Sequence, residues 1–474
     1  MFTASRIRLM VITCAALFMA MLDNLVLGVA LPSIQQSFDA SLTDLQWFMN
    51  AYTLAFAVLL IPFSVLGERL GRKRMFLTGV VLFTLGSAFS GLSESSIQLI
   101  LSRALQGIGG AAVVPLSLTL VNAAFPANMR AAALGIWSGI SGLGLSIGPL
   151  IGGLIVEGAP WQLIFWVNVP VGLFAFILGC FWLTESKGRR KPMDPLGILL
   201  LASGLFGIVY GLEQGNEEGW GSALVVSCLA GGLLLLLFFY LWERTRKQPF
   251  VQFDMFRSGR YSAYIFAGFW MNAGIFGAIF LLTLFLQQGQ GYSALEAGVR
   301  TMAWTGCTML FAPLAGFAVN KFGNRKLLSL GLLFQAVALV GFAWLIIAQG
   351  VDFPFLYQAP LMMLAGTGMG LSFTPLSHGV LSSVPETSAG EASGINNASR
   401  ELGGVFGIAI SGLILEIGDP IQSAADFGTH ITPALLAGAG MLLLGLVSVL
   451  AFARASSTSS LRPSGSVQPA EEMP

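Results

Sequence analysis

Apolar stretches recur along this chain from one end to the other, and few folds can accommodate them. Each stretch is long enough to cross the roughly 30 Å hydrocarbon core of a bilayer as a helix. Only 10% of the residues are charged, against about 25% in a soluble globular chain. The sequence therefore predicts an all-α polytopic protein of the cell membrane. Fourteen transmembrane windows can be placed, at 9–31, 45–66, 75–92, 97–121, 131–156, 161–183, 195–212, 222–242, 261–286, 294–319, 327–348, 355–380, 392–415 and 432–453.

Lysine and arginine residues orient these windows. They cluster in every second connection, and the connections between those clusters contain none of them. Connections rich in lysine and arginine stay in the cytoplasm. We therefore expect both termini to be cytoplasmic, with the Ser- and Pro-rich residues 455–474 forming a disordered cytosolic tail.

Two of the basic connections resemble each other. Residues 64–74 read SVLGERLGRKR and residues 316–326 read GFAVNKFGNRK, so that Gly71 aligns with Gly323. Many secondary transporters consist of repeated halves with the substrate site between them. The alternative is that both segments are simply basic turns that follow the same charge rule.

The repeat predicts a division of the chain into four parts. Residues 1–186 form a first six-helix bundle, and residues 257–454 form a second. Residues 187–256 form an insert of two helices with their linkers, and residues 455–474 form the tail.

Seven glycines and one proline crowd the segment from Gly135 to Gly153. A membrane helix tolerates such residues better than a helix in water, because lipid leaves its backbone no other hydrogen-bond partner. A face of small residues lets another helix approach closely, and a proline can bend the helix there. We expect this face to pack against the opposite half of the protein, as a hinge or seal near the outer side. The residues that form it are Gly144, Gly148, Pro149, Gly152 and Gly153.

Asp23 is the acidic residue that lies deepest within a predicted span. At 1.5 Å per residue it lies roughly 21 Å from the cytosolic face, and Arg103 lies roughly 9 Å from the outer face. The two residues therefore have the same depth in a core of about 30 Å. An ionisable residue inside the membrane is a functional candidate. We expect Asp23 to face a central cavity near Arg103 and to carry a proton; the alternative is a permanent ion pair that only orients two helices.

Four segments resemble the signatures of the major facilitator superfamily. Residues 64–73 (SVLGERLGRK) resemble its cytosolic loop signature, and 101–111 (LSRALQGIGGA) its R-x-x-Q-G-x-G motif. The glycine- and proline-rich segment that begins at Gly135 resembles its antiporter motif. Residues 22–34 (LDNLVLGVALPSI) resemble the first-helix segment of its drug:proton antiporters, especially those with fourteen helices.

This resemblance implies roles for individual residues. It implies a cytosolic gate formed by Glu68, Arg69, Gly71 and Arg72, and a part in proton transfer for Arg103. It also implies two six-helix bundles that alternate access to a substrate site. Two further segments, 161–172 and 390–404, are similar to the fourteen-helix subgroup.

Polar and aromatic residues within the spans are candidates for a substrate pocket, since aromatic and methionine side chains suit lipophilic ligands. The alternative for each is packing or contact with lipid. These candidates are Asn24, Trp137, Trp270, Asn272, Trp304 and Gln335.

Other charged residues have plainer explanations. Glu213 ends a predicted span near the outer face and is expected to be solvated. Glu391, Arg400 and Glu401 are expected near the cytosolic start of a span, either as partners of the 64–74 loop or as ordinary interface residues. Two scattered histidines and four cysteines in apolar stretches give no metal site.

The leading functional prediction is a proton-coupled antiporter that exports lipophilic or cationic compounds from the cytoplasm. It needs no cofactor besides the proton and works as a monomer, without nucleic acid. The alternatives are a dedicated exporter of one metabolite, such as an antibiotic or siderophore, and a solute symporter of the same fold. An enzyme would need clustered reactive groups, and no phosphate-binding G-x-x-x-x-G-K-[ST] motif is present.

Overall fold

A computed structural model describes residues 3–187, 194–246, 249, 251–416 and 424–452, and this part of the chain is helical without strands. The first seven helices are α1 (Ala4–Phe38), α2 (Leu42–Leu70), α3 (Arg72–Gly91), α4 (Ser96–Ala124), α5 (Ala127–Gly158), α6 (Leu163–Trp166) and α7 (Asn168–Trp182). Two helices follow, α8 (Pro195–Glu218) and α9 (Ala223–Thr245). The last six are α10 (Gly259–Leu284), α11 (Ala294–Phe322), α12 (Asn324–Gln349), α13 (Phe355–Leu381), α14 (Ala389–Glu416) and α15 (Ala424–Phe452).

Twelve spans in the described residues are long and apolar enough to cross a membrane. One of them, Leu163–Trp182, combines α6 and α7. Helices α5 and α13 have 32 and 27 residues but are not among the twelve. The chain is therefore a multi-pass membrane protein, and the count of fourteen crossings stays a prediction.

Local sequence explains where several helices begin. Ser41 and Ser293 each accept a hydrogen bond from a backbone N–H of the first turn, and the acidic residues Asp44 and Glu296 bond back to them. These reciprocal bonds satisfy amide groups that an α-helix leaves without partners at its start.

The two similar loops have a similar backbone. Gly71 lies between α2 and α3 with φ 120°, and Gly323 lies between α11 and α12 with φ 78°. Residues with a side chain rarely adopt positive φ values. The aligned glycines therefore make the same sharp turn in the two loops.

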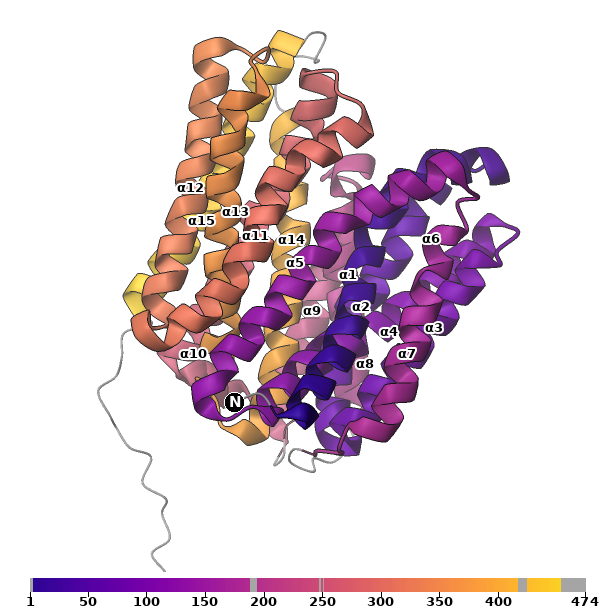
Figure 1. Cartoon of the computed structure of the whole chain (residues 1–474), viewed down its shortest axis with the longest axis vertical. Helices are drawn as coiled ribbons and strands as arrows, with labels where there is room; N and C mark the ends of the chain where they lie inside the picture. The colour runs from indigo at the N-terminus through magenta and orange to yellow at the C-terminus, as the bar shows by residue number, and fades with distance from the viewer. Residues whose placement is uncertain (1–2, 188–193, 247–248, 250, 417–423, 453–474) are drawn as a thin grey trace, which may run out of the picture.

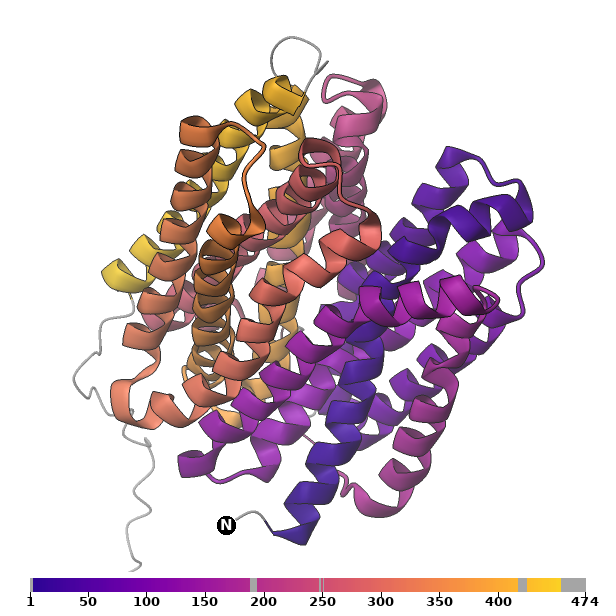
Figure 2. The same ribbon diagram turned by 45° about the horizontal axis from the view of Figure 1, so that its top comes forward.

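The long helices form two groups (Figure 1). Helices α1–α5 and α7 pack against one another, and so do α10–α15. The two groups lie close together at the bottom of Figure 1 and diverge toward its top, and the view in Figure 2 shows the same divergence. Whether the boundaries predicted at 186/187 and 256/257 delimit separate domains stays a prediction.

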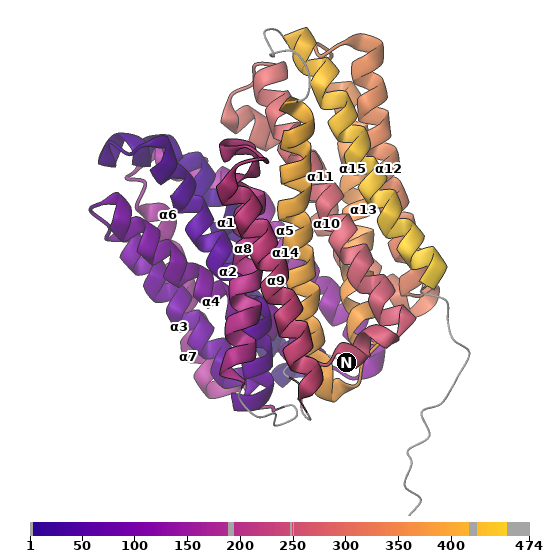
Figure 3. The ribbon, with the colours of Figure 1, turned by 180° about the vertical axis from the view of Figure 1, so that it is seen from behind.

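Helices α8 and α9 lie over the seam between the two groups (Figure 3). Val209 of α8 is fully buried and packs with Leu54 and Ala57 of α2. Nearer the end of α8, Asn216 Nδ2 donates to the carbonyl of Ala409 in α14 at 3.2 Å. Helix α8 therefore bridges the two groups.

The two ends of the described chain lie at the same end of the molecule. Arg6 Nε in α1 donates to the carbonyl of Ala124 at 3.1 Å, and Arg325 Nη2 donates to the carbonyl of Leu450 in α15 at 2.7 Å. Asn320 Nδ2 reaches the carbonyl of Asn128 and links these regions. That this end is cytoplasmic stays a prediction, and the predicted tail at 455–474 lies outside the described residues.

Candidate functional site

Asp23 is fully buried in α1 and is surrounded by hydrogen-bond donors. Arg103 Nη1 donates to its Oδ2 at 2.5 Å. Gln106 Nε2 and Asn168 Nδ2 each donate to its Oδ1 at 2.8 Å. The carboxylate thus has a cationic partner and two amide partners, which satisfies a charge buried in the membrane.

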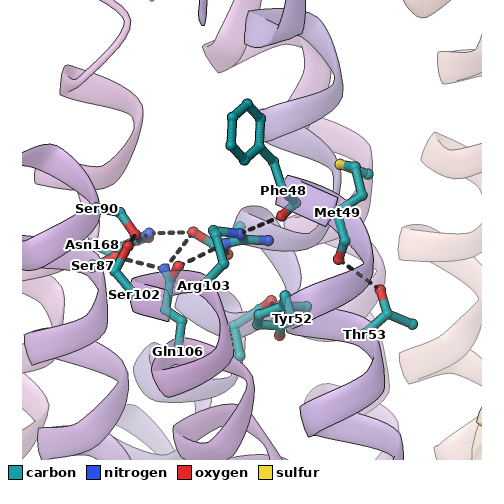
Figure 4. Close-up of polar contacts among 12 residues, drawn as sticks. Phe48, Met49, Tyr52, Thr53, Ser87, Ser90, Ser102, Arg103, Gln106 and Asn168 are labelled. Atoms are coloured by element: carbon teal, nitrogen blue, oxygen red, sulfur yellow. Dashed lines mark hydrogen bonds and ion pairs between the residues drawn. The ribbon is translucent and has the colours of Figure 1, made fainter. Parts of the chain in front are cut away.

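Arg103 is held from several sides. It is 1% exposed, and its Nε donates to the carbonyl of Phe48 at 3.1 Å. Its Nη1 also donates to Gln106 Oε1 at 2.6 Å. The guanidinium carbon lies 4.6 Å from the centre of the Tyr52 ring, a distance that suits cation–π attraction. Figure 4 shows Arg103 between Gln106 on one side and Phe48 and Tyr52 on the other.

A second set of hydrogen bonds fixes the amide side chains that contact Asp23. Ser87 Oγ in α3 accepts from Gln106 Nε2 at 2.8 Å and from Asn168 Nδ2 at 3.0 Å (Figure 4). The Oγ atoms of Ser90 and Ser102 lie 2.8 Å apart beside it. Helices α1, α3, α4 and α7 are therefore joined by one buried polar network.

The network corrects one expectation and adds residues that sequence reasoning missed. We expected Asp23 to face a central cavity, but its side chain has no exposed surface and its partners all belong to α4 and α7. The structure does bring Asp23 and Arg103 together. Ser87 and Asn168 were not predicted; the signal for Asn168 was an amide side chain in the apolar stretch 161–172.

The predicted cytosolic gate contains a buried ion pair. Arg72 Nε and Nη2 donate to the two carboxylate oxygens of Glu68 at 3.0 and 2.8 Å, and both side chains are at most 7% exposed. Arg72 Nη2 also reaches the carbonyl of Glu386 at 3.5 Å. A Cβ atom at Gly390 would overlap the Glu68 carboxylate, so the start of α14 packs directly on this pair.

Three other residues near this gate, Arg130, Arg69 and Gly71, do not take part in the buried ion pair. Arg130 Nη2 forms an ion pair with Glu386 Oε1 at 2.6 Å, but the Glu386 side chain is 76% exposed. One guanidinium nitrogen of Arg69, Nη1, is buried without a partner in the described structure. Gly71 makes the turn into α3 next to Glu185.

The glycine-rich segment contacts two different helices. A Cβ atom on Gly135 would lie 3.0 Å from Gly316 Cα of α11, and one on Gly139 would lie 2.8 Å from Pro313. A Cβ atom on Gly144 would instead lie 2.8 Å from Met21 Cβ of α1. The expectation that Gly144 faces the opposite half is therefore wrong, because the glycines that meet that half come earlier in α5.

The remaining residues of the predicted antiporter motif lie further along α5. Gly148, Gly152 and Gly153 are buried. The side chain of Pro149 lies outside the described residues, and so does that of Asn24.

Four of the predicted pocket residues are buried and bonded within the bundles. Trp137 Nε1 donates to Ser117 Oγ at 3.0 Å and Trp304 Nε1 donates to Met369 Sδ at 3.4 Å. Asn272 and Gln335 donate to backbone carbonyls one turn earlier in their own helices. These contacts favour the packing alternative for the four, while their role in a pocket stays a prediction.

Trp270 differs because it is only partly buried. Its ring lies edge-on to Phe269 at 5.2 Å and to Phe406 at 6.1 Å between centroids. Arg400 and Glu401 lie well within α14 (Ala389–Glu416) rather than at its start. Their expected position near the cytosolic start is corrected for this reason.

The structure corrects the expectation for Glu213 and gives a partner to Glu391. One carboxylate oxygen of Glu213 is buried without a partner in the described structure, so this side chain is not simply solvated. Glu391 is 2% exposed and accepts a hydrogen bond from the backbone N–H of Gln252. It therefore binds the linker before α10, which fits the interface alternative, and a role as partner of the 64–74 loop stays a prediction.

Comparison with known proteins decides the family. Residues 13–408 match the model of the Major Facilitator Superfamily. The chain belongs to this superfamily. This major facilitator is 36% identical over 85% of its length to the tetracenomycin C resistance and export protein of Streptomyces glaucescens, of which the match covers 74%.

Two further relatives are also named as resistance proteins. The chain is 34% identical to the multidrug resistance protein Stp of Mycobacterium tuberculosis, over 86% of this chain and 75% of that protein. It is 30% identical to the methylenomycin A resistance protein of Bacillus subtilis, over 93% of this chain and 94% of that protein. The resemblance to drug-exporting major facilitators is confirmed, and its fourteen-helix subdivision stays a prediction.

Solved structures show the same fold. A double tryptophan mutant of the major facilitator XylE superposes with a TM-score of 0.71 at 15% identity, over 95% of this chain and 96% of that one. The human organic anion transporter MFSD10 superposes with a TM-score of 0.68 at 13% identity, over 94% and 100% of the two chains. Because the chain belongs to this superfamily and its curated relatives are resistance and export proteins, it is a transporter of the cell membrane that handles small substrates, and it is not an enzyme.

Proposed function

We propose that this protein is a proton-coupled antiporter that exports lipophilic or cationic compounds from the cytoplasm by alternating access. The names of its relatives support export, since they describe resistance and export proteins for drugs and antibiotics. The names do not address coupling to protons, and that part of the proposal rests on the buried network around Asp23.

The observation that carries the proposal is the ion pair of Asp23 with Arg103, which lies inside the membrane with almost no exposed surface. Removing one partner of a buried ion pair leaves the other charge uncompensated, at a cost of about 3–5 kcal/mol. If α4 moves relative to α1, Asp23 loses its cation. Binding a proton then removes the carboxylate charge and its cost.

The network defines which hydrogen bonds change when Asp23 is protonated. In the present structure Arg103 Nη1 contacts both Asp23 and Gln106. When Asp23 is protonated, Arg103 keeps Gln106 Oε1, the Phe48 carbonyl and the Tyr52 ring as partners. Proton uptake at Asp23 therefore becomes linked to a shift of α4 against α1 within the first group, and through it to the movement of the two groups that alternating access needs.

The contacts between the two groups of helices suggest which side is closed. The groups meet where Arg72 and Arg130 reach Glu386, and they diverge at the other end (Figure 1). If this end is cytoplasmic, as the basic loops predict, the structure corresponds to an outward-facing state with the cytosolic gate closed.

A second candidate is a dedicated exporter of one metabolite, most simply an antibiotic. The names of two relatives favour it, because each refers to one compound, tetracenomycin C or methylenomycin A. Both candidates use the same fold and the same proton site, and they differ only in the breadth of substrates.

Transport in proteoliposomes tests the proposal. We expect an imposed pH gradient to drive accumulation of ethidium, tetracenomycin C or methylenomycin A, and Asp23→Asn to abolish the effect of the gradient. Arg300→Gln serves as a control, since Arg300 lies at the start of α11 and stacks on Tyr292. Accumulation by the unaltered protein that ignores the gradient would contradict the proposal.

A further inference from the structure

Arg400 is a membrane-embedded arginine whose hydrogen-bond donors are not all used. It lies about 17 Å along α14, at 1.5 Å per residue. Its Nε is buried without a partner, and in the described structure its side chain forms no salt bridge. The residue is nevertheless only partly buried.

Its neighbours hold it within the bundle. The guanidinium carbon lies 4.3 Å from the centre of the Phe373 ring of α13. Its Cγ would lie 3.5 Å from a Cβ atom on Gly268 of α10. Stacking on Phe373 covers one face of the guanidinium and leaves its N–H edges for other partners.

Asn396 is a second polar group with unmet hydrogen bonds at the same place. It lies one turn before Arg400 on the same face of α14, so both side chains approach Gly268. Asn396 is 1% exposed, and neither its amide nitrogen nor its amide oxygen has a partner in the described structure. Buried polar groups without partners are rare and costly.

Two other arginines within the helices show the contrast. Arg103 donates to Asp23, Gln106 and Phe48. Arg300 also has a buried Nε without a partner, but its Nη1 donates to the carbonyl of Glu296 and its guanidinium stacks on Tyr292. Arg400 has an aromatic partner but no acceptor among the described groups.

We infer that Arg400 and Asn396 form a binding site for the oxyanion of an acidic lipophilic cargo, a carboxylate or an ionised phenol. This inference rests on the proposed export function and narrows its substrates. Arginine presents a planar fork of N–H donors that fits a carboxylate, and the Asn396 amide adds another donor. The partly exposed end of Arg400 makes the first contact, and small side-chain movements bring the occluded Nε and amide into reach.

Aromatic side chains for the rest of the cargo lie nearly two turns further along α14, around Phe406. A Cβ atom on Gly403 would collide with the Phe269 carbonyl, so α10 and α14 are in close contact there. The rings of Phe269 and Phe406 lie 5.6 Å apart, and the partly exposed Trp270 adjoins both. Aromatic walls of this kind favour flat lipophilic molecules.

Glu401 does not take the place of this oxyanion. It follows Arg400 directly, so its side chain points about 100° away around the helix. Among the described residues Glu401 forms no ion pair with Arg400, so the guanidinium donors stay open.

A matched set of fluorescent probes tests the inference. Pyrenebutyrate, pyrenebutanol and pyrenebutylamine share one apolar body and differ in charge. Equilibrium binding to the purified protein in detergent, with empty micelles as the blank, needs no proton gradient. We expect pyrenebutyrate to bind at least about tenfold more tightly than pyrenebutanol, since a charge-assisted hydrogen bond in a buried site contributes about 1.5–3 kcal/mol.

Substitutions locate the effect. Arg400→Gln should remove the preference for pyrenebutyrate over pyrenebutanol, because pyrenebutyrate binding weakens while pyrenebutanol binding does not change. Asn396→Ala should reduce this preference by a smaller factor. Arg300→Gln is the control and should keep the full preference. Arg400→Lys keeps the charge but loses the planar fork, so it should retain part of the preference.

Three outcomes would overturn the inference. They are equal binding of the three probes to the unaltered protein, tighter binding of pyrenebutylamine, or a preference for pyrenebutyrate that survives in Arg400→Gln. The first two do not depend on whether a variant folds. Loss of gradient-driven transport with an intact preference for pyrenebutyrate would contradict proton coupling alone, so the two proposals can fail separately.

Discussion

Asp23 in α1 and Arg103 in α4 lie 80 residues apart in the sequence and form an ion pair of 2.5 Å inside the membrane. The pair does not stand alone, because Gln106 and Asn168 also donate to the same carboxylate. The Asp23 carboxylate can lose these partners only by a movement that breaks several hydrogen bonds together. Such coupling suits a transporter whose proton must be exchanged only when its helices move.

The ion pair predicts a non-additive effect on stability. Arg103→Ala should destabilise the protein by about 3–5 kcal/mol, because it leaves Asp23 charged and buried without a cation. The double variant Asp23→Asn, Arg103→Gln should recover most of that loss, since no net charge remains buried. Unfolding measured by steric trapping in bicelles checks both. Equal losses in the single and double variants would show that the pair is not energetically coupled.

The contact between α5 and α11 predicts that Gly316 cannot be enlarged. A Cβ atom there would lie 2.5 Å from the Ala131 carbonyl and 2.9 Å from Gly135 Cα, both of which are backbone atoms. Gly316→Ala should therefore force the two helices apart and destabilise the protein by about 1–3 kcal/mol.

Gly306 provides a matched control in the same helix, because a Cβ atom there would meet nothing within 4 Å. Gly306→Ala should be neutral or raise stability by up to about 1 kcal/mol through helix propensity. Thermal unfolding of both purified variants makes the comparison. If both lost the same stability, close packing at Gly316 would not be the cause.

The two ion pairs at the closed end should differ in strength. The Glu68–Arg72 pair is buried, whereas Glu386, which pairs with Arg130, is mostly exposed. Glu68→Gln should open this end at least about tenfold more often, because it leaves Arg72 without its buried partner. Glu386→Gln should change opening by no more than about fivefold, since an exposed pair contributes at most about 1 kcal/mol.

Labelling of Ser393→Cys measures that opening. Ser393 is fully buried between the groups, where its Oγ donates to the Pro115 carbonyl. The rate of reaction with a water-soluble maleimide, in a background without the four native cysteines, reports exposure of this end. A larger effect from Glu386→Gln than from Glu68→Gln would contradict the assignment of the gate.

The position of α8 predicts that its buried face supports both groups of helices. Val209→Ala should destabilise the protein by about 1 kcal/mol, because the fully buried side chain loses packing contacts with α2 that lipid cannot replace. Val226 on α9 is 51% exposed, and Val226→Ala should have little effect. Steric trapping of the two variants distinguishes them, and equal effects would argue against a bridging role for α8.

Part of this structure follows from the sequence. The depths of Asp23 and Arg103 in antiparallel spans predicted that they could meet, because the rise per residue of a helix is fixed. The repeated loops aligned Gly71 with Gly323, and the backbone has a positive φ at both glycines. The superfamily followed from motifs spread over most of the chain.

Other features could not be predicted because they depend on how helices are rotated against one another. A stripe of glycines indicates a close helix contact but not its partner, so Gly144 was assigned to the wrong neighbour. The positions of Ser87 and Asn168 beside Asp23 depend on the rotation of α3 and α7, which apolar sequences do not define. The same holds for Glu213, whose buried oxygen reflects tertiary packing.

Proton release on substrate binding tests the central claim most directly. Weakly buffered, purified protein in detergent, mixed with an exported compound and a pH indicator, should release protons into solution as the substrate binds. Asp23→Asn should bind the compound and release none, while Arg300→Gln should release as many as the unaltered protein. Equal proton release by the Asp23→Asn variant and the unaltered protein would contradict the assignment of Asp23 as the proton carrier.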